Sequence, residues 1–283
     1  MEAKKLYEQL DKDFIKKGIT EINWLEKMPK LDKYLCENFK QCEMGLMCDF
    51  ADEIDKVYTT VFLSDIVLEK VLSENITNAM IFSHHPTNWD IECHGGNYAA
   101  SEMYIKKLQE RKISIYFLHH PLDNFGEYST CKTFADRIGI KTEQPAFLYY
   151  GAFCGLFGTI DCNTTSELSE KFSLVMGHKT SLYQYGSENI ANEKIALCPG
   201  GGNAMFVLDE MLKNGVKTLV TGVTVKNNYS KNVHDFENIN GINVLGGTHY
   251  STEKFATMKM CEYFKKLGVL AKFVNDEPKF FDL

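Results

Sequence analysis

The sequence predicts an α/β protein with two α/β halves. Short runs of β-branched and aromatic residues alternate with segments of helical period, and residues 57–83 form a first strand–helix–strand unit. The alternation returns at 194–221, after a middle segment, 141–186, that is rich in aromatic residues and glycine. Strand–helix alternation of this kind is typical of parallel sheets with helices on their faces.

Each further element has a local signal. Leu6, Leu10 and Phe14 have helical spacing with polar residues between them, so residues 1–18 predict an amphipathic helix and lack the continuous apolar core of a signal peptide. A threonine or serine cap opens a helix at 164–174. In chain order, strands are expected at 57–63, 79–83, 113–118, 194–198, 216–221, 242–245 and 269–274, and helices at 66–72, 101–109, 164–174, 204–213 and 251–267.

Composition excludes several classes of protein. The chain has 283 residues, 44% of them hydrophobic, which is enough for sizeable cores. Its net charge of −7, without a basic stripe, argues against extended nucleic acid as a partner. Nine cysteines without a Cys-x-x-Cys pair indicate a reduced, cytoplasmic compartment. No segment approaches the roughly 20 apolar residues of a membrane helix, so no membrane partner is expected.

Five of the eight histidines lie in three short motifs that also contain two carboxylates. His84-His85-Pro86 and His119-His120-Pro121 each follow a predicted strand, and Asp123 comes just after the second pair. Ligands of open α/β sheets gather beyond the carboxyl ends of parallel strands. Imidazole and carboxylate together suit zinc, iron, manganese or nickel, so these motifs predict a metal site whose ion the sequence does not identify.

The third motif places His249 and Glu253 four residues apart, after Gly246-Gly247 and near a predicted helix start. If both belong to the first helical turn, their Cβ atoms are about 5–6 Å apart and can chelate one ion. The alternative is an ordinary histidine and glutamate at a helix start, where a negative charge is favourable.

The adjacent histidines at the first strand end suggest more than one ion. Successive side chains of a strand point to opposite faces, so His84 and His85 are expected to serve two ions; the alternative is one core and one surface histidine. Counting donors for two ions leaves positions for water and an excess of positive charge that favours an anionic substrate. The predicted metal ligands are His84, His85, Asp123, His249 and Glu253. His119 and His120 are the candidate catalytic residues, which would move protons at the pocket edge.

The order of the three motifs resembles the NIF-three-like family, whose members include type-2 GTP cyclohydrolase I homologues. The segments 196–202 and 221–222 also resemble signatures of that family. The resemblance implies the same five ligands for a dinuclear metal centre, in the cleft between two interlinked α/β domains, each with a central mixed sheet flanked by helices. It implies domains at 1–126 with 243–283 and at 127–242, and a homo-oligomer, commonly a hexamer built as a trimer of dimers.

The chain also departs from the family pattern. Val223 and Asn227 stand where the family usually has an aspartate and a histidine, residues 87–90 replace apolar residues, and His120 replaces a small polar one. These departures indicate a different substrate pocket.

Two classes of function follow. The first is a metal-dependent hydrolase acting on a small anionic or nucleotide-like substrate, and the second is a non-catalytic metal-binding regulatory or assembly protein. Open water positions favour the enzyme, since structural sites are usually closed by protein ligands. The turn at 200–202 is either a phosphate cradle or a plain tight turn, and Cys198 beside it is expected to be a packing residue.

Overall fold

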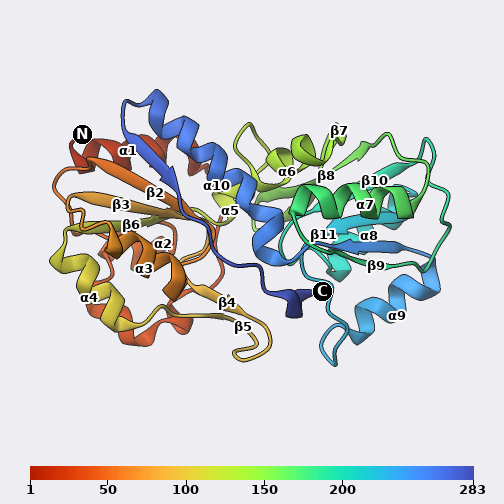
Figure 1. Cartoon of the computed structure of the whole chain (residues 1–283), viewed down its shortest axis with the longest axis horizontal. Helices are drawn as coiled ribbons and strands as arrows, with labels where there is room; N and C mark the ends of the chain where they lie inside the picture. Colours follow the sequence, from red (N-terminus) through yellow and green to blue (C-terminus); the bar gives the residue numbers. More distant parts are fainter. The chain divides into compact units, whose positions relative to one another are not determined.

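The structure is a computed structural model that describes all residues, 1–283. It is a mixed α/β protein with two sheet-containing units, which confirms the predicted fold class (Figure 1). Unit 1 comprises residues 1–122 and 257–277, and unit 2 comprises 123–256 and 278–283. The domain limits expected at 126/127 and 242/243 remain a proposal.

Unit 1 is built on a five-stranded sheet in the order β1-β6-β3-β2-β13. The strands β13, β2, β3 and β6 are parallel, and β1 pairs antiparallel with β6. A two-stranded hairpin, β4-β5, is separate. The elements are α1 (Ala3–Phe14), η1 (Leu25–Lys27), η2 (Pro29–Tyr34), α2 (Glu37–Cys42), β1 (Gly45–Cys48), β2 (Lys56–Thr60), α3 (Asp65–Ser73), β3 (Ala79–Ser83), β4 (Asn88–Asp90), β5 (Gly96–Tyr98), α4 (Glu102–Glu110), β6 (Ile113–Phe117) and β13 (Leu270–Phe273).

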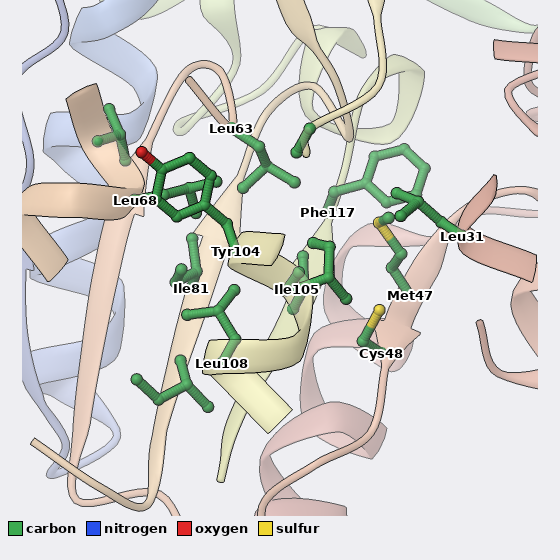
Figure 2. Close-up of a cluster of buried hydrophobic side chains, with 14 of the residues drawn as sticks. Leu31, Met47, Cys48, Leu63, Leu68, Ile81, Tyr104, Ile105, Leu108 and Phe117 are labelled. Carbon is green, nitrogen blue, oxygen red and sulfur yellow. The ribbon is translucent and has the colours of Figure 1, made fainter. Parts of the chain in front are cut away.

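Helices cover both faces of this sheet. On one face, Tyr104, Ile105 and Leu108 of α4 pack in a buried cluster with Ile81 of β3 and Phe117 of β6 (Figure 2). On the other face, Phe82 of β3 contacts the ring of Phe264 in the second half of α10 (His249–Lys266). Tyr116 of β6 stacks on Tyr7 of α1 on the same face. Coverage of both faces explains why the central strands β3 and β6 are buried along their whole length.

Unit 2 contains a six-stranded mixed sheet in the order β7-β8-β10-β11-β12-β9. Its centre, β10-β11-β12, is parallel, so the three strands share one carboxyl edge. Leu197, Val220 and Leu245 belong to one buried cluster, whereas their neighbours belong to another on the opposite face. The elements are α6 (Thr130–Ile138), β7 (Lys141–Tyr149), β8 (Ala152–Thr159), α7 (Thr165–Met176), β9 (Ser181–Tyr183), β10 (Lys194–Cys198), α8 (Met205–Lys213), β11 (Thr218–Thr221), α9 (Lys231–Asn240), β12 (Asn243–Gly246) and η3 (Phe280–Asp282). The short helix α5 (His120–Asp123) begins in unit 1, and its last residue, Asp123, is the first of unit 2.

The strands predicted at 79–83 and 194–198 form with the predicted bounds, and the predicted cap Thr164 accepts from the Glu167 backbone N–H. The long helix α10 begins at His249, two residues before the predicted start. None of the helices is both long and apolar enough to cross a membrane.

Candidate metal centre

The two histidine pairs of unit 1 follow adjacent strand ends. β3 ends at Ser83 and pairs in parallel with β6, so the segments after the two strands leave the sheet side by side. Backbone hydrogen bonds hold them there. The His84 N–H donates to Thr60 O at 3.1 Å, and the Leu118 N–H donates to Ser83 O at 3.1 Å.

His84, His85 and His119 form a three-imidazole group, with one ring nitrogen from each lying within 4.8 Å of the others. The ring centroids of His84 and His85 are only 4.5 Å apart, so the expected projection to opposite faces does not hold. The reason is that β3 ends at Ser83, and strand alternation no longer governs the two residues that follow.

Hydrogen bonds at Nδ1 of His84 and His120 determine the protonation of Nε2 in each ring. His84 Nδ1 is 2.8 Å from Leu118 O, and His120 Nδ1 is 2.8 Å from Thr20 O. Because a carbonyl oxygen only accepts, Nδ1 of each ring carries the proton and donates it. Nε2 is then the nitrogen with a lone pair for an ion or a proton.

Glu21 is a functional candidate that sequence reasoning missed. Its side chain is 1% exposed and lies 3.1 Å from His119 Nδ1. The carboxylate also accepts from the Trp24 indole N–H at 3.0 Å and from the His120 backbone N–H at 2.9 Å. Burial raises the pKa of the Glu21 carboxyl, and the neighbouring His120 and Trp24 donors oppose that shift. Glu21 lies outside every predicted strand and helix and has no motif around it, so no local pattern could have pointed to it.

Aromatic rings surround these histidines. Phe62 stacks on His85 with centroids 4.6 Å apart, and Trp24 meets His119 edge-on at 5.2 Å. His85 is 2% exposed. Such apolar walls lower the local dielectric and strengthen electrostatic interactions with the imidazoles.

In unit 2, His249 and Glu253 form the pair that the i, i+4 spacing predicted. Both lie at the start of α10, with His249 Nε2 3.2 Å from Glu253 Oε1. Thr248, at φ 65°, caps the helix by accepting from the Ser251 N–H. The His249 N–H donates to Asp282 Oδ2 at 2.8 Å, so a buried carboxylate fixes the helix start.

Gly200 leaves space for this pair. A Cβ at Gly200 would lie 2.9 Å from His249 Nε2 and closer still to the Glu253 carboxylate. The Gly200 N–H donates to Thr252 Oγ1 at 3.0 Å. Gly200 is therefore packed against the two candidate ligands, whereas Gly201 of the same turn is exposed.

Asp123 also belongs to unit 2, where it is 8% exposed and accepts from Thr130 Oγ1 at 2.7 Å. The positions that depart from the family pattern have structural roles. The Val223 N–H donates to Gly200 O, and Asn227 Oδ1 accepts from the Tyr229 and Ser230 N–H groups in a local turn.

The chain is thus a two-unit α/β protein in which buried imidazole and carboxylate groups could hold metal ions. Residues 22–278 match the family model of Duf34/NIF3 (NGG1p interacting factor 3), and the chain belongs to this family. It is 30% identical over 196 residues to a "GTP cyclohydrolase 1 type 2 homolog" from Borreliella burgdorferi, covering 69% of this chain and 73% of the relative. A protein of the same name from Archaeoglobus fulgidus is 27% identical over 261 residues, covering 90% and 98%.

Solved structures share the fold. One, named protein ybgI of unknown function, superposes with a TM-score of 0.74 at 18% identity and covers 99% of this chain and 100% of that one. Reduced HcgD from Methanocaldococcus jannaschii gives a TM-score of 0.68 at 20% identity and 98% coverage of both chains. At these identities the likeness concerns the fold alone.

Proposed function

We propose that the protein is a metal-dependent hydrolase with a dinuclear centre, acting on a small anionic or nucleotide-like substrate. The observation that carries this proposal is the group of three imidazoles at the strand ends of unit 1, two of them buried and one partly buried, with donor atoms within 4.8 Å of one another. Clustered imidazoles in an apolar setting suit divalent transition metals. The proposed ligands are His84, His85, Asp123, His249 and Glu253, each of which is buried.

Divalent ions bound by these residues would supply Lewis acidity and a water of lowered pKa. The protein's own part is to orient the ligands. Leu118 O fixes the tautomer of His84, and Asp282 fixes the start of the helix that carries His249 and Glu253. Loss of a hydrogen bond that orients a metal ligand commonly changes metal affinity 10- to 100-fold.

His119 and His120 are the proposed proton carriers. The Glu21 carboxylate favours the proton of His119 on Nδ1, and Thr20 O favours that of His120 on Nδ1. Nε2 of each imidazole is then the atom that accepts a proton from water or donates one to a leaving group.

The relatives' name, GTP cyclohydrolase 1 type 2 homolog, supports a nucleotide-like substrate and a reaction like that of type-2 GTP cyclohydrolase I. A cytoplasmic location and a homohexamer belong to the same proposal. Zinc, iron, manganese and nickel all remain candidates, since histidine and carboxylate suit each of them.

Metal analysis of the purified protein, paired with a substrate screen, tests the proposal. We expect two divalent ions per chain, a loss of at least one ion in His85→Ala and in Glu253→Ala, and turnover of a nucleotide, phosphoester or cyclic amide only when metal is loaded. His94→Ala, which changes an exposed histidine, is the matched control. Less than one ion per chain, unchanged in both ligand variants, contradicts the dinuclear centre.

The second candidate function is a metal-binding regulatory or assembly protein. Val223 and Asn227 favour it, because neither offers acid–base chemistry and both are engaged by the backbone. Two bound ions without turnover of any screened substrate would support this alternative.

A further inference from the structure

Two cysteines of unit 2 lie in contact across neighbouring strands. Cys154 is on β8 and Cys198 ends β10, its antiparallel neighbour, with the two sulfurs 3.9 Å apart. Both side chains pack in the same apolar cluster, beside Phe147 and Val207. A disulfide has an S–S distance of about 2.05 Å, so bond formation brings the two sulfurs about 2 Å closer together.

We propose that Cys154 and Cys198 form a redox-active dithiol that a peroxide oxidises to an intramolecular disulfide. The two thiols differ in access. Cys154 is half-buried, so the oxidant reaches it first, whereas Cys198 is 3% exposed. The hydrogen-bonded Cys154 and burial raise the pKa of the Cys198 thiol, which makes Cys198 the partner that closes the disulfide and not the one that attacks the oxidant.

The chemistry balances with hydrogen peroxide as the oxidant. The Cys154 thiolate attacks one peroxide oxygen and breaks the O–O bond, which gives a sulfenic acid and a hydroxide that the released proton converts to water. The Cys198 sulfur then attacks the sulfenic sulfur, the S–S bond forms, and the hydroxyl leaves with the Cys198 proton as a second water. Two electrons pass from the dithiol to the peroxide, and a small-molecule dithiol reverses the step.

The position of Cys198 connects this dithiol to the candidate ligands. Cys198 is followed by Pro199 and Gly200, and Gly200 is the residue packed against His249 and Glu253. A Cβ at Gly202 would lie 2.7 Å from Cys198 Sγ, so the same turn also encloses that sulfur. Movement of Cys198 toward Cys154 therefore alters the packing of the turn at 200–202, which contacts His249 through Gly200. This consequence rests on the proposed function, whereas disulfide formation does not.

Peptide mapping of the peroxide-treated full chain tests the dithiol. Starting from nine free cysteines, we expect a loss of two thiols, a peptide pair joined through Cys154 and Cys198, and full recovery with dithiothreitol. Cys154→Ser and Cys198→Ala remove the linked pair. Cys131→Ser and Cys162→Ser are matched controls, since both change buried cysteines of the same unit and must leave it intact.

Mapping the wild-type protein needs no variant, so a Cys198 variant that fails to fold does not weaken the test. Oxidation of Cys154 to a sulfinic acid without a linked pair, or disulfides only between chains through the exposed Cys93, overturns the proposal.

Metal content before and after oxidation tests the coupling separately. We expect the oxidised wild-type protein to lose bound metal and oxidised Cys154→Ser to retain it. A mapped disulfide without a change in metal content overturns the coupling. A reduced protein that binds no metal overturns the proposed function and leaves the dithiol standing.

Discussion

The carboxylate of Glu21 lies 3.1 Å from Nδ1 of His119, although the two residues are 98 positions apart in the sequence. His119 in turn contacts the ring of His85 with centroids 4.7 Å apart. A carboxylate that accepts a hydrogen bond from Nδ1–H makes the opposite ring nitrogen more basic and restricts rotation of the ring. Glu21 is therefore a positioning residue for the imidazole group.

Replacing Glu21 with Gln should reduce metal affinity or activity without abolishing metal binding. The amide keeps the size of the side chain but loses the negative charge, so we expect metal affinity or activity to fall about 10-fold. The value for Glu21→Asp should lie between those of the wild type and Glu21→Gln. Competition with a chelator and the pH profile of activity are the measurements. Glu26→Gln, in the same segment and exposed, is the control. Equal effects of both substitutions would contradict the assigned role.

Gly200→Ala should affect the His249–Glu253 pair. The added methyl enters the space between the ligands, and the backbone at φ +59° adds about 1 kcal/mol of strain for a residue with a Cβ. We expect metal binding to fall by about 10-fold or more. Isothermal titration with Zn²⁺ measures the change.

Gly201→Ala is the matched control for Gly200→Ala, because nothing lies within 4 Å of a Cβ at Gly201. Its metal affinity should equal that of the wild type. If Gly200→Ala binds metal as well as Gly201→Ala does, the glycine turn does not border the ligands in solution.

The sequence predicted those parts of the fold that local patterns determine. The strands at 79–83 and 194–198 were found with their bounds because each is a short apolar run between turns. The long hairpin β7-β8 and helix α9 were missed, since β7 has little alternation and α9 buries only His234 and Glu237. Both are held by tertiary contacts that a local pattern does not contain.

The candidate site was predictable in its residue types and less so in its geometry. Strand ends indicated where His84 and His119 lie, and the i, i+4 rule indicated the His249–Glu253 contact. The convergence of His84 with His85 depends on β3 ending at Ser83, so that neither histidine follows the alternation of a strand. The contribution of Glu21 depends on an irregular segment folding back over the second histidine pair, for which no sequence rule exists.

Asp282→Ala should destabilise the start of α10. Asp282 accepts the His249 N–H through its side chain, and its backbone oxygen accepts from the Thr224 and Val225 N–H groups. Removing the carboxylate leaves a buried N–H without an acceptor, which costs about 1–3 kcal/mol. Urea denaturation should show this loss, and Asp282→Asn, which keeps an acceptor oxygen, should recover most of it. A full loss in the asparagine variant would indicate that the charge and not the hydrogen bond matters.

Glu74 gives unit 1 a stability that depends on pH. Its carboxylate lies 2.6 Å from Lys56 Nζ and 2.7 Å from Lys272 Nζ, and it accepts from the Tyr58 hydroxyl, which joins α3 to β2 and β13. Donation from Lys272, Lys56 and Tyr58 lowers the pKa of Glu74 from 4.5 to about 2. Because the pKa is lower in the folded state, the stabilisation is complete above pH 4.5 and is lost as the pH falls toward 2.

The Glu74 side chain is 28% exposed, so solvent screening reduces the effect to about 1 kcal/mol. We expect Glu74→Gln to lower the free energy of unfolding by that amount at neutral pH, and the difference from wild type to shrink steadily with acidification below pH 4.5. Urea denaturation across this range measures it. Glu110→Gln, at the exposed end of α4, is the control and should show no such trend. A difference that stays constant down to pH 2 would mean that Glu74 acts through packing, because only the loss of its charge can make the effect disappear in acid.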